Sequence, residues 1–76
     1  MFYIVLKSQG KEIHRTEWTE HFYELKNVRN RCYRYIKENR CDECEIYQTD
    51  IQYDNQNGKL VEVINENPYV KPKKQM

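Results

Sequence analysis

The 76-residue sequence has only two glycines, and both stand where a turn is expected. Gly10 lies in a short loop between two strand-like runs, and Gly58 follows Asn57 at the strongest turn signal of the chain. Neither is left for a loop that cradles phosphate groups or for the sharp turn of a nucleophilic serine. His14 and His21 could act as acid and base with Glu17 or Glu20, but no nucleophile accompanies them. We therefore expect no enzymatic activity.

The sequence also lacks a long apolar run. No stretch approaches the roughly 20 apolar residues of a membrane-spanning helix, and no N-terminal segment resembles a signal peptide. These absences predict a soluble cytoplasmic protein with no membrane partner.

Cysteine is scarce, and its number, three, is odd, which argues against a secreted disulfide scaffold. Cys41 and Cys44 form a C-x-x-C pair that Cys32 and a histidine could complete as a zinc site. If the helix predicted below continues to Arg40, however, Cys32 and Cys41 lie about 13 Å apart along its axis. The C-x-x-C pair also follows a helix C-terminus and encloses two carboxylates, which disfavours a reactive thiolate. We expect ordinary reduced thiols, no metal and no cofactor.

The organising element is a helix predicted from Glu20 to Arg40, with Thr19 as its N-cap and Trp18 just outside it. At 100° per residue, one stripe of this helix is apolar and should face the core. This stripe consists of Leu25, Val28, Cys32, Tyr35 and Ile36.

Four runs with β-branched, aromatic or alternating residues predict strands over residues 1–7, 11–18, 45–53 and 59–66. The second should be an edge strand, because charged residues dominate it. The order strand, strand, helix, strand, strand predicts an α+β fold, a two-layer sandwich in which one helix crosses one face of a four-stranded antiparallel sheet. We expect a single domain over residues 1–67 and a flexible basic tail over residues 68–76.

Charge is unevenly distributed along the chain. Residues 1–40 carry nine Lys/Arg and five Asp/Glu, whereas residues 41–67 carry one Lys and seven Asp/Glu. The acidic part forms the predicted second hairpin, where carboxylates alternate with tyrosines, a composition that suits a basic partner surface. The residues predicted to bind a protein partner are Asp42, Glu43, Glu45, Tyr47, Asp50, Tyr53, Asp54 and Glu62.

The helix face opposite the apolar stripe is basic and carries interleaved tyrosines. Cations neutralise phosphates and aromatic rings stack on bases, so this face supports an alternative function in nucleic-acid binding, together with the Lys-rich tail. A solvated helix face is the competing interpretation. The residues of the alternative site are Tyr23, Lys26, Arg29, Tyr33, Arg34, Lys37 and Arg40.

One helix can cover only one face of the sheet. The other face should carry Tyr3 and Val5, with either Val61 and Val63 or Leu60 and Ile64, and it is a candidate interface for a homodimer. A curled sheet that hides these side chains is the competing interpretation.

These features favour a small non-catalytic module that binds a protein, with a nucleic-acid-processing host protein, whose basic surface it would occupy, as the expected partner. In size and composition the chain looks like small inhibitors encoded by phages and mobile elements, including anti-CRISPR proteins. That likeness concerns the general type alone, because no motif carries it.

Overall fold

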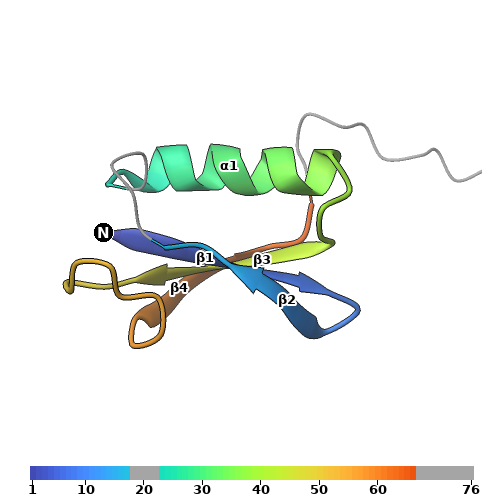
Figure 1. Cartoon of the computed structure of the whole chain (residues 1–76). Helices are drawn as coiled ribbons and strands as arrows, with labels where there is room; N and C mark the ends of the chain where they lie inside the picture. Colours follow the sequence, from blue (N-terminus) through green and yellow to red (C-terminus); the bar gives the residue numbers. More distant parts are fainter. Residues whose placement is uncertain (18–22, 67–76) are drawn as a thin grey trace, which may run out of the picture.

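The computed structural model describes residues 1–17 and 23–66 of the chain. Within them, strands β1 (Phe2–Ser8) and β2 (Lys11–Arg15) precede helix α1 (Leu25–Lys37), and strands β3 (Glu43–Gln48) and β4 (Lys59–Ile64) follow it. The strands form one antiparallel sheet in the order β2-β1-β3-β4, and α1 packs on one of its faces (Figure 1). The predicted fold class is confirmed, and β2 is an edge strand as expected.

The core lies between α1 and the two central strands. Ile4, Leu6 and Ile46 project from the sheet toward Val28 and Cys32 of the helix, and all five are buried. Leu25, Tyr35 and Ile36 pack around them, so the predicted apolar stripe is confirmed. Tyr33 also packs against this cluster, whereas the sequence interpretation placed it on the opposite, basic face.

The helix is shorter than predicted at both ends. It begins at Leu25 rather than Glu20, and its N-cap residue Glu24 makes no side-chain capping hydrogen bond. The capping prediction for Thr19 and Trp18 lies outside the described residues. At the other end Asn39 adopts a left-handed φ of 61°, and the Arg40 amide donates to the Tyr35 carbonyl at 2.9 Å. This Schellman-type ending reverses the chain after Lys37 instead of continuing the helix to Arg40.

The largest error in the predicted strands concerns β3. It was expected over residues 45–53 but runs from Glu43 to Gln48, so Cys44 belongs to the strand and five residues from Thr49 onward do not. The hydroxyl of Thr49 accepts a hydrogen bond from the Ile51 amide and donates one to the Asp54 carboxylate. The Ile51 amide is thereby bonded to a side chain instead of to a neighbouring strand, so the strand does not continue. β2 and β4 also end earlier than expected, at Arg15 and Ile64.

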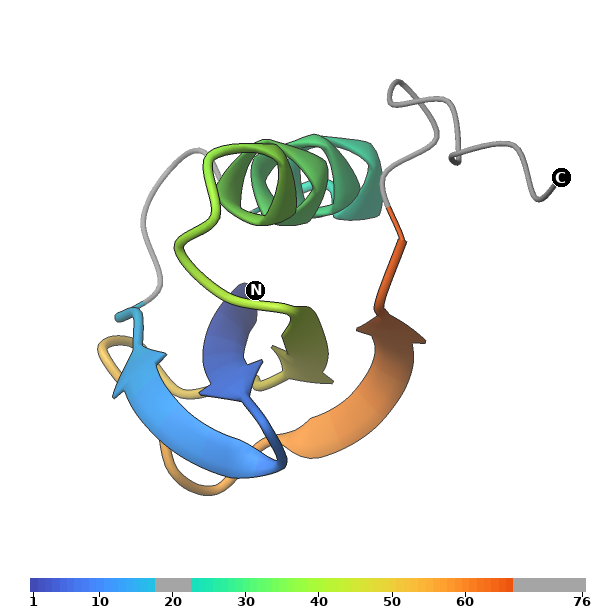
Figure 2. The same ribbon diagram turned by 90° about the vertical axis from the view of Figure 1, so that its right-hand side faces the viewer.

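The sheet is curled: in Figure 2 the beginnings of β2 and β4 lie farther from α1 than β1 and β3 do, so the face that α1 does not cover is concave. Tyr3 and Val5 on this face are 1% and 2% exposed, so the expectation that they form an open interface was wrong. Tyr3 stacks on Tyr47 with ring centroids 5.1 Å apart, and Arg15 reaches across to a backbone carbonyl of the β3–β4 connection. The chain therefore fills much of this concave face itself.

Strand β4 keeps exposed apolar side chains: Leu60, Val61 and Val63 are 44–50% exposed. Neither predicted pairing of these residues is correct, because a bulge in β4 breaks the alternation, while Ile64 points into the core. A homodimer through this side of the sheet stays a prediction. In the described part of the chain no helix is long and apolar enough to cross a membrane.

Candidate functional site

The connection between β3 and β4 is held by hydrogen bonds to other parts of the described chain. It comprises residues 49–58, which we call the β3–β4 loop, and it lies at the end of the sheet next to the N-terminus (Figure 1). The Thr49 amide donates to the Met1 carbonyl at 2.9 Å, and the Gly58 amide donates to the Tyr3 hydroxyl at 3.0 Å. The Arg15 guanidinium donates to the Asn55 carbonyl at 2.6 Å. The loop is thus attached to the domain at both ends and in the middle.

Inside the loop, the carboxylate of Asp54 is the central acceptor. It accepts hydrogen bonds from the Thr49 hydroxyl at 2.7 Å and from the amides of Gln56 and Asn57 at 3.1 Å. The Asn57 side chain adds a fourth bond at 3.1 Å. These bonds, that of the Thr49 hydroxyl most of all, lower the pKa of Asp54. None of these donors carries a positive charge. The hydrogen bonds therefore order the loop without neutralising the negative charge of the Asp54 carboxylate.

Gly58 is required because its surroundings are crowded. A Cβ atom there would lie 2.7 Å from the Gln48 carbonyl oxygen and 2.8 Å from Cε2 of Tyr3. The sequence analysis placed this glycine in a turn, where a positive φ is common, but the residue of this loop that adopts a positive φ is Tyr53, at 63°. That conformation is rare and strained for a bulky side chain.

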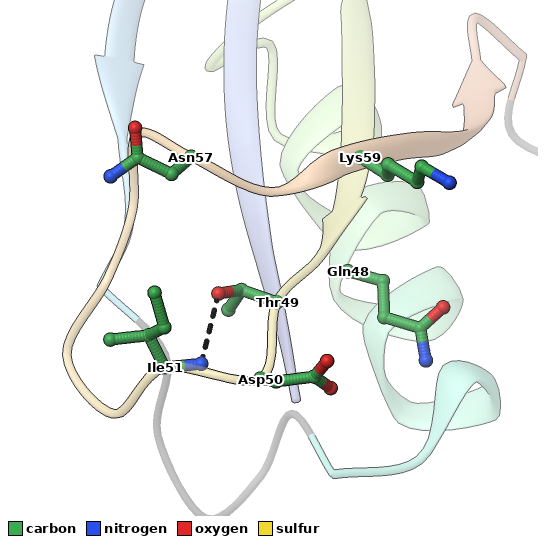
Figure 3. Close-up of a pocket in the computed structure, with 6 residues that line it drawn as sticks. All are labelled: Gln48, Thr49, Asp50, Ile51, Asn57 and Lys59. Atoms are coloured by element: carbon green, nitrogen blue, oxygen red, sulfur yellow. Dashed lines mark hydrogen bonds between the residues drawn. The ribbon is translucent and has the colours of Figure 1, made fainter.

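The loop displays its two largest apolar side chains instead of burying them. Ile51 is 60% and Tyr53 is 68% exposed. Ile51 borders an open hollow of about 480 Å³, which is lined by Gln48, Thr49, Asp50, Ile51, Asn57 and Lys59. Figure 3 shows that the polar ends of Gln48, Asp50 and Lys59 point to the same side of this hollow, away from Ile51. The site therefore combines an apolar pair with a polar border.

The predicted acidic site is not one continuous patch. Asp42 and Glu43 lie at the start of β3, whereas Asp50 and Asp54 lie beyond its other end, about 20 Å away for a strand of this length. Between these ends, Glu45 pairs with Lys7 at 3.4 Å and accepts the Tyr47 hydroxyl at 2.9 Å.

Two further residues of the predicted acidic site already have partners in the fold. Glu62 pairs with Arg29 at 2.8 Å, and Asp42 accepts the Gln9 amide at 2.9 Å. Asp50 and Tyr53 are the predicted residues that the β3–β4 loop brings together at an exposed position. Sequence reasoning left out Ile51 because it selected the acidic and tyrosine side chains of this segment. The Thr49 and Asp54 pair was the available signal for a structured loop.

The predicted basic site is also divided by contacts within the fold. Arg29 is turned toward Glu62 on β4, Tyr33 packs against the core, and Arg40 pairs with Glu38 at 3.0 Å. Arg34 makes a longer pair with Glu38 at 3.5 Å. Lys26 and Lys37 remain exposed on the outer side of α1, and Tyr23 is exposed just before the helix.

The three cysteines meet in the core, because the chain reversal after Lys37 returns Cys41 to the sheet. This corrects the predicted separation of Cys32 and Cys41. All three are free and buried, and the Cys41 and Cys44 sulfurs lie 3.5 Å apart. Within residues 1–17 and 23–66 no three His, Cys, Asp or Glu side chains are arranged to hold a metal ion, and His21 lies outside this part.

The buried thiols are expected to react slowly in the folded protein. Burial raises the pKa of Cys41 to about 12, and the neighbouring Cys32 thiol together with burial raises the pKa of Cys44. Relative to a free thiol of pKa about 8.5, the thiolate fraction of Cys41 at pH 7 falls about a thousandfold or more. Iodoacetamide labelling followed by mass spectrometry should show this slowing in the native chain and lose it in urea. If the cysteines of the native chain were labelled as fast as those of the chain in urea, the buried position of the thiols would be contradicted.

The ionisation of Asp54 should be visible in the amides that it accepts. The pKa of Asp54 in the folded chain lies below the ordinary value of 3.8. The ionised Asp54 therefore stabilises the fold at pH values above 3.8, and this stabilisation is lost as the pH falls through the pKa of the folded state. The amide proton shifts of Gln56 and Asn57, followed by NMR, should therefore titrate with a midpoint below 3.8. An Asp54→Asn variant should show no such titration, and a midpoint above 4 in the native chain would contradict the hydrogen-bonding scheme.

Comparison with protein-family models, curated proteins and solved structures gives no match for this chain, so the interpretation of this site depends on its own residues.

Proposed function

We propose that this chain is a small non-catalytic module that binds a protein partner through the β3–β4 loop. The observation that carries the proposal is the display of Ile51 and Tyr53, 60% and 68% exposed, by a loop whose backbone is fixed at both ends. Large exposed apolar side chains on a fixed support are the usual anchors of protein interfaces.

The bracing of the loop supports binding because it reduces the entropy lost when a complex forms. Ordering a flexible loop costs free energy at the moment of association, and a preorganised loop avoids that cost. Here Asp54 and Thr49 order the loop from within, while Arg15 and Tyr3 hold it from the sheet. The left-handed conformation of Tyr53 fits this interpretation, since strained residues persist where surrounding contacts fix them, and they gather at functional sites.

The charge of the loop supports a partner of a particular chemistry. Asp50 and Asp54 are acidic, residues 49–58 contain no Lys or Arg, and Lys59 at the hollow offsets one of these two negative charges. A complementary surface has an apolar pocket for Ile51 and Tyr53 with lysine or arginine at its border. Proteins that handle nucleic acids carry such basic surfaces. An inhibitor of such a protein, of the kind that phages and mobile elements encode, is one form this module would take.

The test is a capture experiment followed by measured affinities. The immobilised chain is incubated with nuclease-treated lysate of its host, and captured proteins are identified by mass spectrometry. Binding of each purified protein is then measured by calorimetry to the wild-type chain and to an Ile51→Ala/Tyr53→Ala variant. Anchors of this kind contribute about 2 kcal/mol or more each, about 30-fold in affinity, so the loss of both should weaken binding about a thousandfold.

Ile13→Ala is the matched control, because Ile13 is an exposed apolar residue, 52% exposed, on strand β2. This variant should bind like the wild type. Equal weakening by the control and by the loop variant, or full binding by the loop variant, would overturn the assignment to this loop.

A further inference from the structure

The outward side of α1 carries a second candidate surface, separate from the β3–β4 loop. Five residues at helical spacing lie opposite the buried Val28 and Cys32, and all five are exposed. We call them the outer stripe of α1: Lys26, Asn27, Asn30, Arg34 and Lys37. The stripe contains only lysine, arginine and asparagine, that is, cations and amides.

Contacts on the two flanks of the helix separate these residues from the other cations. Arg29 is held by Glu62 of β4, and the guanidinium carbons of Arg31 and Arg40 lie 6.0 and 5.6 Å from the ring centroid of Tyr35. Residues 25–37 contain five Lys/Arg and no carboxylate. Glu38, just past the helix, pairs with Arg34 at 3.5 Å and with Arg40 at 3.0 Å, and it is the acidic partner of the stripe among the described residues.

From this arrangement we propose that the outer stripe of α1 binds duplex DNA by entering the major groove. The side chains match the chemistry of that groove: asparagine pairs with adenine edges, arginine and lysine pair with guanine edges, and lysine also neutralises phosphates. A helix with its side chains is about 10–12 Å across, which matches a groove about 12 Å wide. The stripe from Lys26 to Lys37 is about 17 Å long, the rise of about five base pairs.

The position of α1 leaves this side open. The helix forms the outer layer on its side of the sheet (Figure 1), whereas the β3–β4 loop contacts Tyr3 on the opposite face of the sheet. A protein held by the loop and a duplex held by the helix would therefore not compete for the same surface. The A-form RNA duplex is excluded as the preferred ligand because its major groove is too narrow for a helix.

The test uses fluorescence anisotropy with a labelled 30-base-pair DNA duplex of mixed sequence. With Lys26, Arg34 and Lys37 each at a phosphate, log K should fall with log salt at a slope near −2.7, about a 40-fold loss of affinity between 50 and 200 mM. In the Lys26→Gln/Lys37→Gln variant the slope should shrink to about −0.9 and binding at 50 mM salt should weaken. Circular dichroism checks that each variant is folded.

Lys11→Glu is the control, since it gives the same net charge of −1 as the double variant, from +1 in the wild type, and lies at the exposed start of β2. It should bind DNA within about twofold of the wild type if the stripe, rather than overall charge, makes the contact. Asn30→Ala should keep the salt slope and lose about tenfold in preference for the best duplex selected from a randomised pool.

The proposal is overturned if a 30-base-pair RNA duplex or single-stranded DNA binds as tightly as the DNA duplex. It is also overturned if Lys11→Glu weakens binding as much as the helix double variant does, or if the double variant keeps the wild-type slope. Absence of binding at 50 mM salt with 100 μM chain, about the weak end of non-specific DNA affinity, overturns it as well.

Discussion

Replacing Tyr3 with alanine is expected to leave much of the chain unfolded at 25 °C. The ring of Tyr3 is 1% exposed and stacks on Tyr47, and its hydroxyl accepts the Gly58 amide at 3.0 Å. Truncating a buried aromatic side chain costs about 3–5 kcal/mol, and a domain of this size is stable by only a few kcal/mol. Urea denaturation followed by circular dichroism measures the loss.

Two further variants separate the ring from the hydroxyl. Tyr3→Phe keeps the stacking and removes the acceptor for Gly58, which should cost about 1–2 kcal/mol. Ile13→Ala, on an exposed position of β2, should change stability by less than about 0.5 kcal/mol. If Tyr3→Ala unfolds at the same urea concentration as the wild type, the concave face of the sheet is not a packed part of the domain.

Replacing Tyr53 with glycine is expected to separate stability from binding. Tyr53 has a φ of 63° and is 68% exposed, so its side chain adds strain while burying little surface. Glycine adopts this conformation without steric cost, so Tyr53→Gly should be about 1 kcal/mol more stable than Tyr53→Ala, which keeps the strain. Both variants should bind the partner found by capture at least about 30-fold more weakly than the wild type, since both lack the ring.

The stability comparison and the binding comparison are independent tests. Thermal unfolding of the two variants measures the first, and calorimetry with the partner measures the second. Full binding by Tyr53→Gly would remove Tyr53 from the interface, whereas equal stability of the glycine and alanine variants would show that the backbone there is relaxed.

The order of elements was predictable because each element has a strong local pattern. The apolar stripe through Val28 and Cys32 and the dense β-branched run of β1 identify a helix and a strand without tertiary information. The helix start was not predictable in this way. The capping signal in the sequence lies at Thr19 and Glu20, whereas the helix begins at Leu25, where no side chain makes a capping hydrogen bond. Local propensity is a weak guide where several start positions are available.

The structure of the β3–β4 loop depends on contacts that span the chain. Alternating residues after Gln48 look like a continued strand, yet Thr49 and Asp54 bond to each other and end it. Arg15 and Tyr3, distant in sequence, then hold Asn55 and Gly58 in place. These long-range bonds bury Tyr3 and expose Ile51, and no local pattern distinguishes those two outcomes.

The partner-binding residues show the same limit. Sequence reasoning identified an acidic, tyrosine-bearing segment, and Asp50 and Tyr53 are exposed within it. It could not foresee that Glu45 and Glu62 would be paired with cations inside the fold, since their partners Lys7 and Arg29 come from β1 and α1. Composition indicates the charge of a surface, whereas tertiary contacts decide which charges remain available.

Amide ¹⁵N relaxation of the free chain tests the central claim most directly, because docking by a preorganised loop requires that the loop be ordered before any partner binds. Residues 49–58 should give backbone order parameters of about 0.85, equal to those of strands β1 and β3. Values below about 0.6 across Asp50–Asn55 would show a flexible connection and would contradict the account.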